Sequence, residues 1–258
     1  MKMTVLCRLM LATGAVLAIF ACTYLYPAKI PMETLEYRTQ MDASGRTLLI
    51  MLPGRLGTAE GFMAEGFVDM VRKAGNAVDV IAAEAYIGYY YNQTVVERIR
   101  EDIVLPAKAR GYSRIWILGI SMGGMGAIWY DRTYPGELDG LILLAPYLGD
   151  RQIADEVAAA GGIRGWHQAA QDRGSFPEDL WGMIKGYEDH KTTAVRLFLG
   201  YGLQDSYALS NSLLAREIPA DQVTALTGSH DWQTWRLLLT TLLENQLLLR
   251  GLDPLQSR

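Results

Sequence analysis

Cysteine is almost absent from this chain. Only Cys7 and Cys22 occur in 258 residues, so the rest of the chain can form no disulfide and no cysteine-based metal site. Histidine is scarce as well, because His167, His190 and His230 are the only three and no H-E-x-x-H motif is present. We therefore expect no zinc site and no metal cofactor.

Blocks of basic residues are also lacking. The chain has 24 Lys and Arg against 28 Asp and Glu, a formal net charge of −4, and this balance argues against nucleic acid as the main partner. Half of the residues are hydrophobic, which excludes a disordered chain and supplies a sizeable core. The length suits one catalytic domain with a modest insertion, and the oligomeric state stays open.

Residues 1–26 are predicted to be a leader. Lys2 and Arg8 precede an apolar run over residues 9–21, which suits the core of a signal peptide and is short for a membrane span. The run leads into Ile-Phe-Ala-Cys22, which is similar to a bacterial lipobox, so Cys22 is the candidate for lipid attachment. We expect a lipoprotein on the periplasmic side of a bacterial envelope. An uncleaved signal anchor and a secreted protein are the alternatives.

Short apolar runs alternate with helical patterns after residue 46. Continuous apolar strands are buried on both faces, as in a parallel sheet covered by helices. We therefore expect an α/β fold with a mostly parallel sheet of about six strands. The expected strands are 47–52, 77–82, 115–120, 141–146, 196–201 and 222–226, with one edge strand at 36–40. The expected helices are 59–74, 94–110 (kinked or ended by Pro106), 122–134 and 232–249.

These elements indicate a single catalytic domain over residues 47–250. A linker with the edge strand is expected at 27–46, and a short tail at 251–258. Residues 150–192 interrupt the alternation with six glycines, Trp166 and Trp181, and predict an inserted lid.

Gly119-Ile-Ser121-Met-Gly123 is a G-x-S-x-G motif between an expected strand and an expected helix. A nucleophilic serine needs this strand–turn–helix context, because the sharp turn exposes its hydroxyl. Side chains at the two glycine positions would clash with neighbouring backbone. Ser121 is therefore the candidate nucleophile, and the helix N-terminus behind it favours developing negative charge.

A candidate acid and a candidate base follow later strands. Asp205 comes just after strand 196–201 and His230 just after strand 222–226. The chain order Ser121, Asp205, His230 is the order expected on such a sheet. Asp231 is a weaker candidate for the acid, because a carboxylate beginning a helix is common.

An oxyanion hole requires two backbone N–H groups. We assign the N–H of Met122, which follows the nucleophile, and the N–H of Arg55, in the loop after strand 47–52. Leu56 is the alternative to Arg55. Tyrosines at 86, 89, 90 and 91 either line an acyl or aromatic pocket or pack at the surface.

The segments Gly-Ile-Ser121-Met-Gly-Gly-Met-Gly-Ala and Gly-Ser-His230-Asp-Trp-Gln-Thr-Trp resemble those of the α/β-hydrolase superfamily, in particular its esterase D-like branch, over residues 47–249. The resemblance implies Ser121 as nucleophile, Asp205 as acid and His230 as base. That branch includes carboxylesterases, thioesterases and acyltransferases, so the substrate does not carry over.

The expected function is a serine hydrolase that cleaves a small-molecule or lipid ester, or a thioester, through an acyl-enzyme outside the cytoplasm. No cofactor is implied. An acyltransferase on the same triad and a non-catalytic envelope binding protein are the alternatives.

Overall fold

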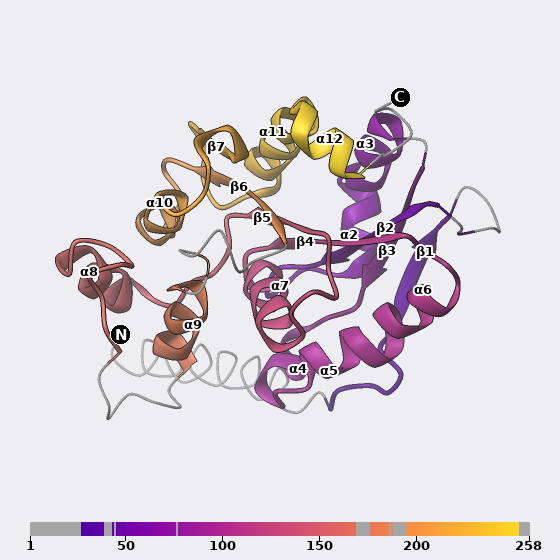
Figure 1. The fold of residues 1–258 in the computed structure, drawn as a ribbon, viewed down its shortest axis with the longest axis horizontal. Helices are drawn as coiled ribbons and strands as arrows, with labels where there is room; N and C mark the ends of the chain where they lie inside the picture. Colours follow the sequence, from indigo (N-terminus) through magenta and orange to yellow (C-terminus); the bar gives the residue numbers. More distant parts are fainter. Residues whose placement is uncertain are drawn as a thin grey trace, which may run out of the picture.

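Seven strands form one sheet in the order β1-β3-β2-β4-β5-β6-β7 (Figure 1). This computed structural model describes residues 27–38, 43, 45–75, 77–168, 176–185, 187 and 195–252, so the expected leader with Cys22, and His190, lie outside the described residues. The strands are β1 (Thr34–Tyr37), β2 (Thr47–Leu52), β3 (Val78–Ala83), β4 (Arg114–Ile120), β5 (Gly140–Leu144), β6 (Arg196–Gly202) and β7 (Val223–Leu226).

The sheet is parallel except at one edge. Strands β2 to β7 are mutually parallel, and β1 pairs antiparallel with β3. The expected mostly parallel sheet is confirmed. It has seven strands because the edge strand joins the six parallel ones. The edge strand lies at Thr34–Tyr37, slightly before the expected position of 36–40. The carboxyl ends of all six parallel strands consequently meet at one edge of the sheet.

Alternate side chains of the central strands pack into two different cores. In β2, Leu48 and Ile50 contribute to one hydrophobic cluster, whereas Leu49 and Met51 contribute to the other. This period of two explains why a continuous apolar run was needed: both faces of the strand are covered by helices.

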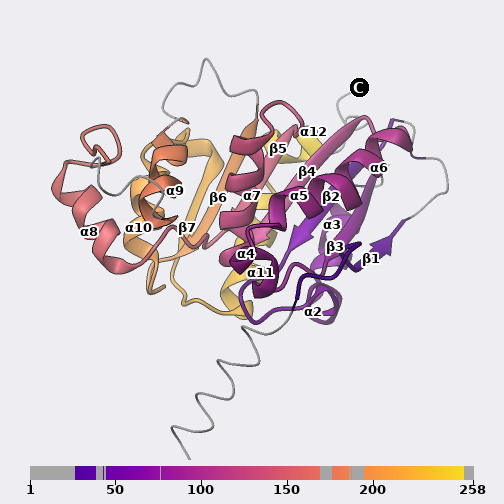
Figure 2. The same cartoon turned by 90° about the horizontal axis from the view of Figure 1, so that it is seen from below.

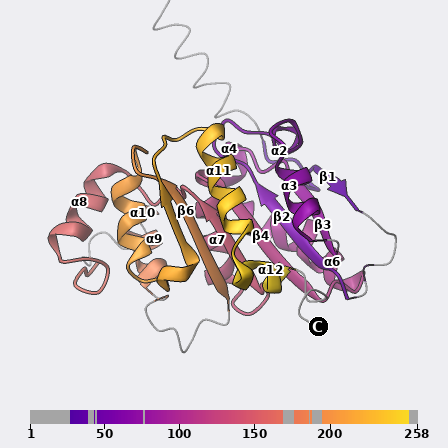
Figure 3. The ribbon, with the colours of Figure 1, turned by 90° about the horizontal axis from the view of Figure 1, so that it is seen from above.

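Two helical layers provide that cover. One face carries α2 (Ala59–Ala64), α3 (Phe67–Ala74), α11 (Trp232–Leu243) and α12 (Gln246–Leu252), seen in front in Figure 3. The other face carries α4 (Ile87–Tyr91), α5 (Val95–Ile99), α6 (Leu105–Ala109), α7 (Met122–Thr133) and α9 (Phe176–Lys185), seen in front in Figure 2. Helices α8 (Arg151–Ala159) and α10 (Ala208–Ala215) contact each other beside β6.

Two of the expected helices are each split in two. The pattern at 59–74 forms α2 and α3, because Gly66 takes a left-handed φ of 79° between them. The pattern at 232–249 forms α11 and α12. The second of these extends through Leu252, which is buried, so the last helix continues two residues into the expected tail.

Pro106 neither ends nor interrupts its helix. A π-helical turn, Arg100–Val104, lies between α5 and α6, and Pro106 occupies the first turn of α6. A π turn closes a wider ring of backbone than an α turn, which makes room for the proline and its missing N–H.

The described parts of the 150–192 insertion are the helices α8 and α9 and a turn that follows α8. Trp166 and Trp181 are buried in the core on the α7 side of the sheet. The hydroxyl of Tyr187 donates a 2.8 Å hydrogen bond to the carboxylate of Asp131 in α7. The insertion is therefore joined to the domain along α7, and the start of α8 is its described part that borders the candidate site described below.

Candidate active site

Ser121 occupies a strained turn between β4 and α7. Its backbone angles are φ 52° and ψ −115°, a conformation that non-glycine residues rarely adopt. The N–H of Ser121 donates to the carbonyl of Leu144 at 3.0 Å, and its own carbonyl accepts from the N–H of Tyr147 at 2.9 Å. The end of β5 and the loop after it thus hold the turn in place.

The two glycines of the motif are required by contact with backbone. A Cβ at Gly119 would lie 2.3 Å from the carbonyl oxygen of Gly123, and a Cβ at Gly123 would lie 2.1 Å from the carbonyl oxygen of Leu52. Both distances are far shorter than van der Waals contact. The expected clash at these positions is confirmed, and the second one shows that the Ser121 turn packs directly on the end of β2.

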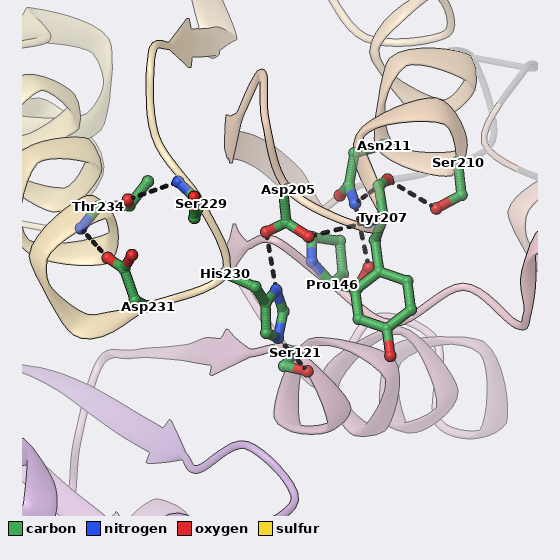
Figure 4. Close-up of polar contacts among 10 residues, drawn as sticks. All are labelled: Ser121, Pro146, Asp205, Tyr207, Ser210, Asn211, Ser229, His230, Asp231 and Thr234. Atoms are coloured by element: carbon green, nitrogen blue, oxygen red, sulfur yellow. Dashed lines mark hydrogen bonds and ion pairs between the residues drawn. The ribbon is translucent and has the colours of Figure 1, made fainter.

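His230 links Ser121 to Asp205. Its Nε2 lies 2.9 Å from Ser121 Oγ and its Nδ1 lies 2.7 Å from Asp205 Oδ2 (Figure 4). An ionised carboxylate can only accept, so Nδ1 carries the proton and Nε2 is left to accept from the serine hydroxyl. The arrangement can therefore take a proton from Ser121 as its oxygen attacks an electrophile.

The loops after β6 and β7 bring the acid and the base together. A Cβ at Gly202 would lie 2.3 Å from the carbonyl oxygen of Gly228, so the two loops are in backbone contact. Asp205 is buried, and its second oxygen, Oδ1, accepts the N–H of Tyr207 at 2.8 Å. This i to i+2 bond is an Asx turn, so Asp205 shapes its own loop as well as binding His230.

Asp231 faces the other way. Its carboxylate caps α11 by accepting the N–H of Thr234 at 2.8 Å, and Figure 4 shows it directed toward that helix. This hydrogen bond lowers the pKa of the Asp231 carboxyl. The expected role of Asp231 as a helix N-terminal charge is confirmed. Of the other two histidines, His167 lies in the insertion and is exposed.

Two aromatic rings flank the imidazole. Tyr207 and Trp235 each meet the ring of His230 edge to face, with centroids 5.0 Å away. Neither ring was placed at the site from the sequence alone. A signal for Trp235 was present in the motif His-Asp-Trp-Gln-Thr-Trp, but spacing alone does not show which tryptophan faces the histidine.

Met122 and Arg55 lie where the oxyanion donors were expected. Both line the same cavity as Ser121. Within the described residues, neither backbone N–H donates to another protein group. Leu56, the alternative to Arg55, lines the neighbouring cavity and is not among the residues that line the one at Ser121, which favours Arg55.

The cavity at Ser121 has a volume of about 720 Å³ and largely apolar walls. Helix α7 contributes Met122, Met125 and Trp129 to one side. Loops after other strands contribute Tyr147 and Tyr207, whose rings meet edge to face at 5.4 Å. Asp150 and Arg151, at the start of α8, border it as well. An apolar cavity with a few polar groups is the usual form of a small-molecule site.

The four tyrosines within residues 86–91 lie in three different places: the cavity at Ser121, the core and a second cavity. Tyr90 and Tyr91 line the cavity at Ser121, and burial raises the pKa of Tyr90. Tyr89 is buried and donates to the carbonyl of Lys29. Tyr86 lines a second cavity of about 700 Å³, which shares Arg55 and Ile87 with the first.

Within the described ranges, no group of three or more His, Cys, Asp and Glu side chains is placed to hold a metal ion.

No protein-family model matches this chain. An acetyl esterase from Caldicellulosiruptor saccharolyticus is 22% identical over 172 residues. That segment is 62% of this chain and spans only 64% of the relative's length.

Solved structures match a larger share of the chain. S-formylglutathione hydrolase (FrmB) from Staphylococcus aureus has a TM-score of 0.56 at 15% identity, covering 85% of this chain and 97% of that one. Est1E from Butyrivibrio proteoclasticus, solved with ferulic acid bound, has a TM-score of 0.57 at 14% identity, covering 84% and 94%. At these identities the similarity is one of fold.

Proposed function

We propose that this chain, which has the α/β-hydrolase fold, is a serine-dependent ester hydrolase. The main support for this proposal is the chain of hydrogen bonds from Ser121 through His230 to Asp205, at the carboxyl edge of the sheet. The names of its relatives, an acetyl esterase among them, support ester hydrolysis in general.

The proposed reaction proceeds through an acyl-enzyme. Ser121 Oγ attacks the ester carbonyl carbon while His230 Nε2 takes its proton, and Asp205 holds the imidazole by its Nδ1–H. The N–H groups of Met122 and Arg55 stabilise the oxyanion of the tetrahedral intermediate. The imidazolium then gives its proton to the departing alcohol. Water repeats the sequence on the acyl-enzyme, releasing the acid and restoring Ser121.

The cavity indicates the kind of ester. Its aromatic and methionine walls suit an apolar acyl group, and its volume suits a small molecule or one lipid chain. A thioester would react by the same steps. An added alcohol in place of water would give acyl transfer, and product analysis with and without that alcohol distinguishes the two reactions.

We further propose that the protein is held at a bacterial membrane by its leader, through a lipid on Cys22. The support is the sequence alone: an apolar run over residues 9–21 that leads into a lipobox-like segment. Among the described residues, no helix combines the length and the apolar character needed to cross a bilayer.

The test of catalysis is labelling with a fluorophosphonate, followed by hydrolysis of p-nitrophenyl esters of increasing chain length. Ser121→Ala should lose labelling and His230→Ala should lose about 10⁴–10⁶-fold in kcat, with unchanged circular dichroism. Ser206→Ala is the control, because Ser206 borders the same cavity. Full labelling of Ser121→Ala would overturn the assignment. An unlabelled, inactive wild type would indicate a binding protein.

A further inference from the structure

Exposed apolar side chains gather at the edge of the sheet that holds the candidate active site. Seven large apolar side chains are exposed among the described residues. Four of them, called here the edge patch, are Ile30 (72% exposed), Leu56 (89%), Tyr91 (49%) and Leu203 (54%). Large apolar groups left in water at one place commonly mark a surface that contacts something else.

The sheet topology places all four at the same edge. Leu203 directly follows β6, Leu56 lies four residues after β2, and Tyr91 ends the helix that follows β3. Ile30 precedes β1, whose first residue pairs with the last residue of β3, so it lies at that edge too.

The edge patch flanks Ser121 on both sides. Ser121 follows β4, which lies between β2 and β5 in the sheet. Ile30, Tyr91 and Leu56 belong to the side of β1, β3 and β2, and Leu203 belongs to the side of β6. A surface docked on the edge patch would therefore lie over the opening to Ser121, where Tyr91 also lines the cavity.

The chain enters the domain at this edge. The hydroxyl of Tyr86 donates to the carbonyl of Pro27 at 2.7 Å, and the hydroxyl of Tyr89 donates to the carbonyl of Lys29 at 2.8 Å. Both tyrosines follow the carboxyl end of β3. The apolar run of the leader ends at Ala21, and the six residues from there to Pro27 span at most about 22 Å even when fully extended.

We propose that the edge patch docks on a lipid bilayer and that the substrate is a lipid ester presented to Ser121 from that bilayer. This rests on the proposed hydrolase and on its membrane-held leader. Whether a lipid on Cys22 or an uncleaved apolar run holds the chain, the attachment keeps this edge within about 22 Å of the membrane surface. Separate apolar side chains around an opening suit shallow insertion into a fluid bilayer, where no shape complementarity is needed. The acyl chain then enters the apolar cavity without crossing water.

The activity test compares one protein on two substrates. The full chain is reconstituted in phosphatidylcholine vesicles and assayed on a long-chain 4-methylumbelliferyl ester dissolved in the bilayer and on soluble 4-methylumbelliferyl acetate. The variant is Ile30→Ser/Leu203→Ser, because Leu56 is the alternative oxyanion donor and Tyr91 lines the cavity at Ser121. The control is Leu105→Ser/Leu237→Ser, which removes two exposed leucines from the outer faces of α6 and α11.

The edge-patch variant should lose at least about fivefold on the bilayer ester and stay within about twofold on the acetate, whereas the control should lose neither activity. Equal losses on both substrates, or no loss on either, would overturn docking through the edge patch. An inactive wild type on both esters would count against the proposed hydrolase instead.

A second measurement needs no activity. Ile30→Trp and Leu105→Trp are compared in vesicles that contain brominated phosphatidylcholine, which quenches tryptophan inside the bilayer. The fluorescence of the tryptophan introduced at position 30 should be quenched. The fluorescence of the tryptophan introduced at position 105 should not be quenched. Equal quenching at the two positions, or none at position 30, would contradict the docking surface even in an active enzyme.

Discussion

At the scale of single residues, the two carboxylates considered as partners of His230, Asp205 and Asp231, bind different groups. Asp205 lies 25 positions before His230 in the sequence, yet it holds the imidazole at 2.7 Å. Asp231 is the direct neighbour of His230, yet it caps α11. The difference arises because Asp231 begins a helix, where the N–H groups of the first turn compete for its oxygens.

This division predicts opposite effects of one chemical change. Asp205→Asn should lower kcat by up to about 10⁴-fold, because the amide cannot hold the imidazole in the productive tautomer. Asp231→Asn should leave kcat within about threefold, because asparagine is as good an N-cap. Steady-state hydrolysis of a p-nitrophenyl ester measures both. If Asp231→Asn were the damaging change and Asp205→Asn harmless, Asp231 would be the acid.

At the scale of elements, α11 both covers the sheet and orients the base. Trp232 packs edge to face on Phe67 at 5.4 Å and on Phe62 at 6.0 Å, which joins α11 to α2 and α3. Trp235, one turn further along, meets His230. The motif His-Asp-Trp-Gln-Thr-Trp therefore supplies the base, the helix cap, a packing residue and a residue that positions the base.

Replacing the two tryptophans separates these roles. Trp235→Leu should lower kcat about 10–100-fold with little change in KM, because a misplaced imidazole slows proton transfer more than binding. Trp232→Leu should lower thermal stability and leave kcat nearly unchanged, since Trp232 has no ring contact with His230 among the described residues. Kinetics and thermal denaturation of both variants test this. Equal losses of kcat would mean that Trp235 acts only through packing.

The contact between α7 and the insertion contains a buried acid. Asp131 is 4% exposed and accepts the hydroxyl of Tyr187. Burial raises the pKa of its carboxyl, and this outweighs the opposite effects of the Tyr187 hydrogen bond and of Arg132. The folded protein consequently favours the protonated acid, and its ionisation costs stability.

This gives a pH dependence with a definite sign. A pKa raised above the ordinary 3.8 means that the stability of wild type declines, relative to Asp131→Asn, as pH rises through the folded-state pKa. Between pH 3.5 and 7, the difference in unfolding free energy should therefore move in favour of the variant. Urea unfolding at several pH values measures it. Parallel pH curves for the two proteins would contradict the prediction.

At the scale of the whole molecule, the proposals about the leader and about the catalytic domain can be tested independently. Cys22 is the candidate lipid site, and the described part of the chain begins at Pro27. If the leader is a lipoprotein signal, the wild type should partition with membranes, whereas Cys22→Ser should fail to mature normally.

Mass spectrometry of the mature N-terminus decides between the three forms of the leader. A lipid-modified Cys22 is the expected result. An unmodified N-terminus at residue 22 or later would indicate secretion, and an intact Met1 would indicate an uncleaved anchor. The proposed catalysis would survive each outcome, because Ser121, Asp205 and His230 all lie in the folded domain.

Elements that depend on local physics can be predicted from the order of residues alone. Six strands appear where the sequence predicted them, and five of these are apolar runs that must be covered on both faces, whereas β7 is half-buried. Part of the Ser121 turn is also local, since glycine at 119 is required by the backbone of Gly123, whereas glycine at 123 is required by the distant end of β2. The chain order of serine, acid and base was visible as well.

Features that depend on contacts between distant residues could be seen only in the folded chain. Ser121 and His230 lie 109 positions apart and meet because β4 to β7 are adjacent and parallel, so their carboxyl ends share an edge. The rings of Tyr207 and Trp235 against His230, and the edge patch around the cavity, follow from the same juxtaposition. No local pattern encodes them, because each joins residues that only the order of strands in the sheet brings together.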